Sequence, residues 1–383
     1  MLCLNGGSSS LKFTLFRLDP GEERRLVTGA VEGIGTGAGH AWVDHEGKRS
    51  DRRAAFPDAG AALAVAFELL SGSHAPEPDV VGHRVVHGGP EHTEPVVVDA
   101  AFLRSLEALV PMAPLHLPGA LAAMRAVSER FPGLSQIACF DTAFHRTMPL
   151  VARRLPIPDE LHEAGVRRYG FHGLSYEYVV QTMGARALGR AVIAHLGSGA
   201  SMCAVQGGRS VDTTMSFTPT AGLVMGTRSG DLDPGLVVYL LDHGYDARRL
   251  ERLVNDEAGL LALSERTSDM RALLAARERD PRAALAIDVF CYQARKWVGA
   301  LAAAIGGLDT LVFTGGIGEH APEVRRRICT DLAHLGITLD DGRNQAHAAI
   351  VSTDASPCRV RVVPTDEERM IARHTRRTLG SAA

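Results

Sequence analysis

Polar residues that could act together on one small anion are spread over the whole chain. They are Asn5, Ser8, Ser10, Lys12, Arg84, His116, Asp141, His172, Arg228 and Glu367. The cations can stabilise negative charge, the hydroxyls can position an anion, and the carboxylate and amide oxygens can hold Mg²⁺. Transfer of a phosphoryl group asks a protein for these three things, so the set predicts phosphoryl transfer.

One kind of residue is absent from this set, and its absence limits which chemical class can accept the phosphoryl group. No carboxylate base stands next to a nucleophilic side chain in the pattern. A hydroxyl acceptor needs such a base, whereas an acid substrate is already ionised at pH 7 and needs none. The sequence is therefore typical of a kinase that phosphorylates a carboxylate.

The polar turn 5–10 lies between two apolar runs, which indicates a hairpin whose turn carries chemistry. Its paired glycines permit positive φ, so that backbone N–H groups, hydroxyls and Lys12 can all donate to one phosphate. Related turns follow apolar runs at 197–200 and 314–319. Each could be a plain connection between strands, and none is a Walker A loop. Their repetition predicts a nucleotide held between two halves.

Arg84 and Asp141 are polar residues tied to apolar runs. Arg84 lies within the run 79–86, where an arginine among valines is costly unless it is paired. It must therefore meet a buried carboxylate or face a cleft that receives an anionic ligand. Asp141 follows the run 136–140, at the strand end where open α/β sheets meet ligands and metal ions, although an Asp there could also cap a helix.

The elements that position these residues are predicted from apolar periodicity. Strands are expected at 79–86, 136–140, 191–195, 201–205, 311–313 and 359–363. Helices are expected at 59–70, 119–131 and 176–188, over much of 234–305, and from Pro322.

Helix caps are predicted at Ser175, Ser268 and Thr365, and Thr365 has the spacing of a capping box with Glu368. The run Arg325–Arg327 is expected to form a solvated helix face.

Length and composition describe a globular protein of two domains. The chain has 383 residues, of which 45% are hydrophobic and 22% charged, with a formal charge of −3. These values disfavour a nucleic-acid binder or a membrane protein. The cysteines are far apart and are expected to be reduced core residues. The sequence shows no leader and no apolar run long enough to span a bilayer, so a cytoplasmic protein is expected.

The motifs around these residues closely resemble those of the acetate kinase family, in family order from end to end. They are Asn5–Phe13, His83–Gly89, Phe140–His145, Arg168–Gly173, Gly226–Asp231, Thr314–Glu319 and Pro364–Glu368. The resemblance implies an α/β protein with the duplicated actin-like ATPase (RNase H-like) fold. It implies one domain of residues 1–142 plus 368–383, a second of 143–367, and an active site in the cleft between them.

The activity that the resemblance implies is reversible transfer of the ATP γ-phosphoryl group to acetate, which gives acetyl phosphate and ADP, with Mg²⁺ or Mn²⁺ as cofactor, in a homodimer. Arg84 and Arg228 would hold the acetate carboxylate and the transferring phosphoryl group. His172 would hydrogen-bond that group in the transition state, His116 would help position it, and Asp141 would be an essential acidic residue near the metal and the phosphoryl group.

The resemblance also implies the binding residues. Asn5 and Glu367 would fix the metal through waters. The acetate methyl pocket would be lined by Val86, Leu115, Phe171 and Pro219. ATP would be bound by Ser8, Ser10, Lys12, His195, Gly197, Ser198, Gly199, Asp269, Met270, Arg271, Gly315, Gly316, Ile317 and Gly318.

The chain departs from the usual family residues at positions outside the chemical step. They are Leu117 for Asn, Leu174 for Thr, Tyr176 for His, Ser198 for Asn, Met270 for Phe and His320 for Asn. The departures at Ser198, Met270 and His320 put nucleotide affinity and choice in doubt, and the departure at Leu117 bears on how His116 is oriented. Propionate or butyrate kinase is an alternative within the class. A non-catalytic nucleotide-dependent binding protein is an alternative outside the class. An actin-like or chaperone-like ATPase is disfavoured, because it would not need two cleft arginines beside a histidine.

Overall fold

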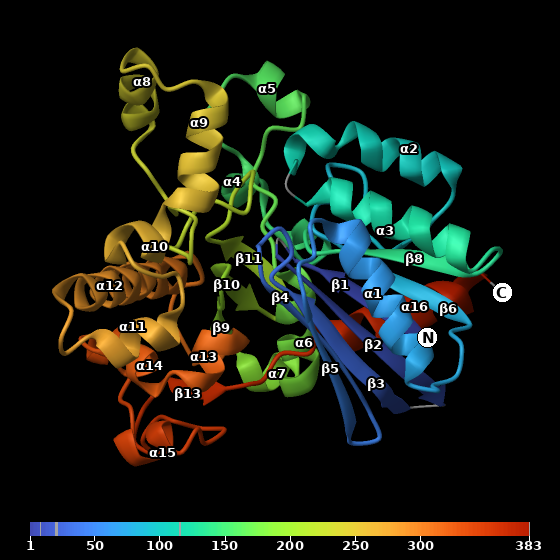
Figure 1. Cartoon of the computed structure of the whole chain (residues 1–383). Coiled ribbons are helices and arrows are strands. Elements are labelled where there is room, and N and C mark those ends of the chain that lie inside the picture. Colours follow the sequence, from blue (N-terminus) through green and yellow to red (C-terminus); the bar gives the residue numbers. More distant parts are fainter. Residues whose placement is uncertain (8, 20–21, 115, 383) are drawn as a thin grey trace. The chain divides into compact units, whose positions relative to one another are not determined.

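The computed structural model describes residues 1–7, 9–19, 22–114 and 116–382. The chain folds into two compact units. The first unit comprises Met1–Ala143 and Asp366–Ala383, and the second comprises Phe144–Thr365. Each unit is built around one mixed β-sheet with helices packed on it (Figure 1).

The first unit contains an eight-stranded sheet in the order β5-β4-β3-β2-β1-β6-β8-β7. The strands are β1 (Leu2–Gly6), β2 (Ser10–Asp19), β3 (Glu22–Glu32), β4 (Gly39–His45), β5 (Lys48–Ala54), β6 (Val80–Val85), β7 (Val96–Val97) and β8 (Ser135–Phe140). The helices are α1 (Ala59–Gly72), α2 (Ala100–Ala108), η1 (Val110–Met112), α3 (Leu117–Arg130) and α16 (Glu367–Ala382).

The two faces of this sheet receive different helices. Val81 of β6 belongs to a buried cluster with Leu63 of α1 and Val127 of α3. The next residue, Gly82, lies against Ile371 of α16, where an added Cβ would come within 2.5 Å of that side chain. Because successive residues of a strand point to opposite faces, α16 covers the face opposite to α1 and α3.

The second unit contains a five-stranded sheet in the order β11-β10-β9-β12-β13. The strands are β9 (Arg190–Leu196), β10 (Ala200–Gln206), β11 (Arg209–Thr213), β12 (Thr310–Thr314) and β13 (Arg359–Val362). The helices are η2 (Ala143–Thr147), which begins at the last residue of the first unit, α4 (Leu150–Arg153), α5 (Asp159–Glu163), α6 (Gly173–Met183), α7 (Ala185–Leu188), α8 (Pro234–Asp242), α9 (Ala247–Arg252), η3 (Leu253–Glu257), α10 (Gly259–Ser264), α11 (Met270–Ala276), α12 (Pro281–Ala304), α13 (Gly315–His320), α14 (Pro322–Cys329), η4 (Ala333–Leu335) and α15 (Asp341–Gln345).

The two sheets share one strand pattern. In the second unit β9 pairs antiparallel with β10 and parallel with β12, and the outer pairs are β10–β11 antiparallel and β12–β13 parallel. In the first unit β1 pairs in the same way with β2 and β6, and the outer pairs are β2–β3 antiparallel and β6–β8 parallel. The core topology is therefore duplicated, and β4, β5 and β7 extend only the first sheet.

A single helix was predicted at 176–188, and the structure corrects this. The chain forms α6 and α7, which are separated at Gly184, where φ is 79°. Helix α6 begins at Gly173, after His172 in the left-handed region with φ of 58°. The predicted cap Ser175 therefore lies inside the helix.

Two other predicted caps are wrong by one residue. Asp269, not Ser268, caps α11, since its carboxylate accepts hydrogen bonds from the backbone N–H groups of residues 271 and 272. Asp366, not Thr365, occupies the cap position of α16 and accepts from the N–H of residue 369. In both places the carboxylate adjacent to the helix takes the free N–H groups, so the capping box proposed for Thr365 does not form.

The predicted solvated face at Arg325–Arg327 is wrong for its first member. Arg325 is fully buried, and its guanidinium donates to both carbonyl oxygens of Asn344 and to the backbone oxygens of Gly318 and Glu319. Burial lowers the pKa of Arg325 to about 10, which leaves it cationic at neutral pH. These oxygens replace the water that a buried charge loses, so Arg325 ties α14 to the end of α13.

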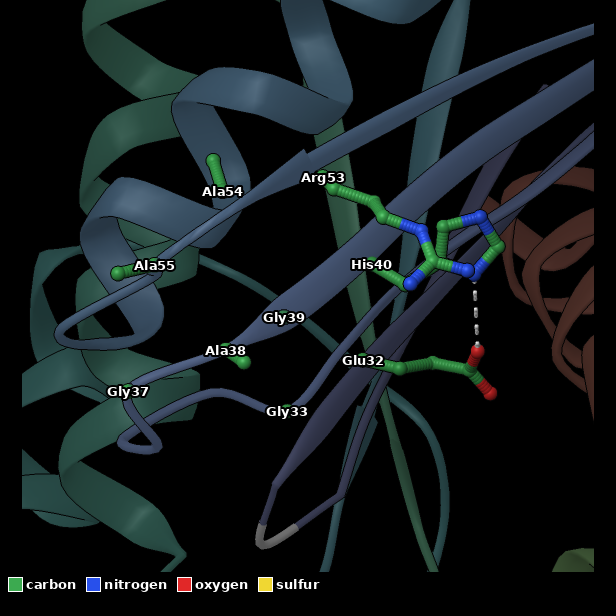
Figure 2. A pocket seen from close by; sticks show the side chains of 9 residues that line it. All are labelled: Glu32, Gly33, Gly37, Ala38, Gly39, His40, Arg53, Ala54 and Ala55. Carbon is green, nitrogen blue, oxygen red and sulfur yellow. Dashed lines mark ion pairs between the residues drawn. The ribbon is translucent and has the colours of Figure 1, made fainter.

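A pocket at the edge of the first sheet contains none of the predicted site residues. Its lining residues are Glu32, Gly33, Gly37, Ala38, Gly39, His40, Arg53, Ala54 and Ala55. Figure 2 shows its ion pair between Nδ1 of His40 and the carboxylate of Glu32, at 3.9 Å. Among the described residues, no helix is long and apolar enough to cross a bilayer.

Candidate active site

The first unit brings Arg84, Asp141 and Asn5 together. Nε and Nη2 of Arg84 donate to Oδ2 of Asp141 at 2.9 and 2.6 Å. Nη1 donates to Oδ1 of Asn5 at 3.1 Å and to the backbone oxygen of Gly6 at 3.2 Å. Arg84 is thus held at the end of the first hairpin by a carboxylate of the protein, which was one of its two expected partners.

Nearby carboxylates keep Arg84 positively charged. Burial alone would lower the pKa of Arg84, but the negative charges of Asp141 and Glu367 outweigh it and raise the pKa above its ordinary value. Asp141 is fully buried, while the Arg84 side chain keeps 13% of its surface exposed. The pair therefore presents a fixed cation to any anion that reaches it.

The predicted metal residues Asn5 and Glu367 are in contact. Nδ2 of Asn5 donates to Oε2 of Glu367 at 2.9 Å and to Oε1 of Glu368 at 2.8 Å. Sequence reasoning missed Glu368 as a site residue because it was assigned to a helix cap, although its place beside Glu367 was a signal. These carboxylates fit Mg²⁺, which prefers oxygen ligands, keeps several waters and is bound in proteins through one or two carboxylates. In the described part of the chain, no cluster of three or more His, Cys, Asp or Glu side chains forms a closed metal cage.

A cavity of about 310 Å³ in the first unit adjoins Arg84. The predicted residues Ser10, Val86 and His116 line it beside Arg84, together with apolar side chains such as Leu63 and with the polar side chains of Asp58 and His83. Lys12 lies on β2 with its side chain exposed. The predicted residues Ser8 and Leu115 lie outside the described residues.

In the second unit, His172 and Arg228 both face the turn between β9 and β10. A Cβ added at Gly199 of that turn would lie 3.4 Å from Nε2 of His172 and 3.5 and 3.7 Å from the terminal nitrogens of Arg228. Nη1 of Arg228 also donates to the backbone oxygen of Pro219 at 2.9 Å. Two predicted catalytic groups therefore meet at the second glycine turn, and the backbone of Pro219, a predicted pocket residue, contacts one of them.

The ring of His172 is held on two sides. Its Nδ1 lies 2.8 Å from Oγ of Ser201, and the ring stacks on His195 with centroids 4.3 Å apart. Phe171 is buried, and its backbone oxygen accepts a hydrogen bond from Nε2 of His145 at 3.0 Å. Burial lowers the pKa of His145 to about 4, so it is neutral at pH 7 and supports the turn as an uncharged donor. Sequence reasoning missed Ser201 and His145.

A cavity of about 410 Å³ in the second unit collects most of that unit's predicted ATP-binding residues. Those that line it are Gly197, Ser198, Asp269, Met270, Arg271, Gly316 and Ile317. His320 also lines it, so the departures at Ser198, Met270 and His320 all fall in this cavity. The other predicted residues lie outside the lining: His195 is on β9, Gly199 is in the turn before β10, and Gly315 and Gly318 are on α13.

The third glycine turn, predicted at 314–319, is mostly the short helix α13. Gly315 opens it with φ of 76°, and an added Cβ there would lie 2.8 Å from the backbone oxygen of Leu196. Oε1 of Glu319 accepts hydrogen bonds from the N–H groups of Gly315 and Thr365, at 2.9 and 3.0 Å. The close approach requires glycine, and Glu319 fixes the turn.

The family model described as the acetokinase family matches residues 1–373. The chain belongs to this family. It is 47% identical over 388 residues to the acetate kinase of Nitrobacter hamburgensis, across 98% of this chain and 95% of that protein. The crystal structure of Porphyromonas gingivalis acetate kinase is similar with a TM-score of 0.87 and 37% identity, over 99% of both chains.

A propionate kinase from Francisella tularensis subsp. tularensis SCHU S4 is also similar, with a TM-score of 0.89 and 36% identity, over 97% of this chain and 98% of that one. The predicted family is confirmed, and with it the duplicated actin-like fold and an enzyme of the kinase class. The repeated strand order agrees with that fold.

Proposed function

We propose that this protein is an acetate kinase, which reversibly transfers the γ-phosphoryl group of ATP to acetate. The observation that carries the proposal is its similarity, over nearly its whole length, to proteins named acetate kinase. The two clusters of polar side chains support it. The first unit offers Arg84 to a carboxylate, and the second offers Arg228 and His172 to a phosphoryl group beside a cavity that suits a nucleotide.

The chemistry follows from charge and position. Acetate is ionised at neutral pH, so its oxygen can attack without a base, and Arg84 would orient that carboxylate. Arg228 and Nε2 of His172 would stabilise the charge that develops on the transferring group. Asp141 would keep Arg84 in place. His116 would help to position the phosphoryl group, and Val86, Phe171 and Pro219 would surround the acetate methyl.

Mg²⁺ is the cofactor we propose, or Mn²⁺ in its place. Asn5, Glu367 and Glu368 would hold it through waters, since hard oxygen groups are what these ions prefer. The ion would neutralise charge on the phosphates of the nucleotide. Ser10 and Lys12 of the first hairpin would assist in binding these phosphates.

The groups proposed for one reaction come from both units, so we propose that the units are the two domains of the family fold and close on their substrates. The hinges would lie near residues 142 and 367, where the chain passes between the units. Small-angle scattering should detect compaction with MgADP, acetate and a planar phosphate mimic, and no compaction would argue against closure.

A homodimer is proposed on the apolar surface of α8. This helix has no buried residue, and its large apolar side chains are exposed, with Val238 at 59%, Tyr239 at 56% and Leu241 at 48%. Such a patch on a soluble enzyme marks an interface, and a second copy would cover it. We also propose a cytoplasmic location, because all the cysteines are buried free thiols.

Propionate kinase is the second candidate, because the cavity beside Arg84 and Val86 is larger than an acetate methyl needs and because a propionate kinase is among the similar structures. Incubation with MgATP, hydroxylamine and either acetate or propionate tests both candidates. We expect acetyl hydroxamate with acetate. Product only with propionate would reject acetate as the substrate, and no product with either acid would reject a carboxylate kinase.

A further inference from the structure

Behind the ring of His172 lies a chain of two hydroxyl groups. Oγ of Ser201 lies 2.8 Å from Nδ1 of His172 and also contacts the hydroxyl of Tyr176. Tyr176 and Ser201 are fully buried. The three groups form a relay that ends on one ring nitrogen, while the other, Nε2, faces the turn at Gly199.

The direction of this relay decides where the imidazole proton sits. The Ser201 hydroxyl has one hydrogen and stands between two partners, so it accepts from one and donates to the other. A phenol is more acidic than an aliphatic hydroxyl, and its oxygen is a weaker acceptor. Tyr176 therefore donates to Ser201, and Ser201 donates to Nδ1 of His172. Since the bond at one ring nitrogen sets the state of the other, the neutral ring carries its proton on Nε2.

A second relay has the same form on the neighbouring ring. The Thr365 hydroxyl donates to Oγ of Ser175 at 2.8 Å, and Oγ of Ser175 lies 2.8 Å from Nδ1 of His195. The rings of His195 and His172 are stacked, with 4.3 Å between centroids and 21° between planes.

Other cationic or titratable groups lie close to His172. A proton on both stacked rings would place two positive charges in contact, and the Arg228 guanidinium also faces the turn at Gly199. The relay acts on the neutral ring, in which only one of the two nitrogens carries a proton.

We propose that Tyr176, acting through Ser201, holds His172 as the neutral tautomer whose Nε2–H donates to the transferring phosphoryl group. Tyr176 and Ser201 are then positioning residues for the phosphoryl transfer. The proposal rests on the function proposed above. The phenol hydroxyl of Tyr176 supplies the donor at the start of the relay.

Nitrogen NMR of the protein labelled at histidine tests the tautomer directly. The signals of His172 are assigned by their loss in His172→Gln. We expect the wild type to show an unprotonated Nδ1 and a protonated Nε2. In Tyr176→Phe the two tautomers should mix, and kcat should fall by about three- to tenfold, the factor that one hydrogen bond is worth in an equilibrium. The KM for ATP should stay unchanged.

The matched control is Tyr178→Phe, which makes the same change on α6 at a half-buried position outside the relay. It should leave the His172 signals and kcat at their wild-type values. Ser201→Ala interrupts the relay at its centre and should give the same spectral change as Tyr176→Phe. It replaces that variant in the test if Tyr176→Phe fails to fold.

A wild-type ring with its proton on Nδ1 would overturn the proposal. His172 signals that do not change in Tyr176→Phe, or in Ser201→Ala, would overturn it as well. The spectra do not require catalytic turnover, so they determine the tautomer even if the wild type forms no acetyl phosphate. The absence of acetyl phosphate would reject the proposed function and would leave the tautomer to be decided by the spectra.

Discussion

The two units place different chemistry on the same part of a shared scaffold. In each, a turn follows the central strand, β1 in the first unit and β9 in the second. At the first turn the cation Arg84 is locked by the buried carboxylate of Asp141. At the second, Arg228 faces Gly199 beside His172 and donates to a backbone oxygen. The duplicated sheet thus fixes where a ligand can be met, while side chains from neighbouring strands and loops decide which ligand it is.

Removal of either arginine should have the largest effect. Arg84→Ala and Arg228→Ala should each cut turnover by roughly 10³ or more, the scale of a charge-stabilising arginine in phosphoryl transfer, and leave ATP binding largely intact. Arg84→Ala should also destabilise the fold, by about 3–5 kcal/mol, because it removes the guanidinium from the buried carboxylate of Asp141.

Steady-state kinetics of both variants and thermal unfolding of Arg84→Ala would check these effects. Near-normal turnover in both variants would remove the arginines from the mechanism. Unchanged stability in Arg84→Ala would show that the buried Asp141 carboxylate does not depend on Arg84.

His172 gives the next largest effect. His172→Ala removes a donor from the second turn and should lower kcat by about 10² to 10³. His172→Gln keeps an N–H donor and should lose less, because the ionised acceptor requires no proton transfer. Measurement of kcat in both variants separates the roles. Equal and complete loss, with rescue by imidazole only in the alanine variant, would instead indicate that His172 moves a proton.

Each unit also contains a deeply buried histidine whose pKa is lowered by burial, and these two histidines should behave alike. Burial lowers the pKa of His83 in the first unit and of His145 in the second to about 4, from an ordinary value near 6.5. Between these values the unfolded chain binds a proton that the folded chain does not. Stability therefore rises with pH, and each histidine contributes up to ~3 kcal/mol above pH 6.5 that is lost as the pH falls towards 4.

Denaturant unfolding at a series of pH values checks this dependence. His83→Gln and His145→Gln should each flatten the loss of stability between pH 6.5 and 4. A wild-type stability that does not change over this range would contradict the buried neutral state of both histidines.

The smallest effect concerns which unit sets the size of the acyl group. Val86 lines the cavity of the first unit beside Arg84, so Val86→Ala should raise kcat/KM for propionate relative to acetate, by up to about 10- to 200-fold, with little change in the KM for ATP. Val97→Ala, the same change at an exposed residue of β7, is the control. An unchanged ratio in Val86→Ala would show that this side chain does not limit the acyl group.

Much of the fold could be predicted because its signals are local. Apolar runs located the strands that carry Arg84 and precede Asp141, and the motif order identified the family. Helix boundaries were less certain, because a cap depends on which residue adopts the cap conformation. That choice moved the cap from Ser268 to Asp269.

The parts of the site that could not be predicted depend on contacts distant in sequence. The sequence predicts an exposed Arg325, but the fold buries it among the oxygens of Asn344 and of α13. Ser201 is one small hydroxyl in an apolar strand, and only the fold brings it to His172. A pattern along the chain carries no information about such pairs.

The position of helix α16 at the end of the chain affects the order in which the two units can fold during synthesis. It packs on β1, β6 and β8, which lie in the first half of the chain, and the whole of the second unit is encoded between them. At ~5–20 residues per second, a ribosome needs on the order of tens of seconds to pass from residue 143 to this helix. During that time the face of the sheet at Gly82, which Ile371 later covers, stays exposed. The second unit can thus finish folding before the first, although the first emerges earlier, and the nascent first sheet is the part of the chain that needs protection from aggregation.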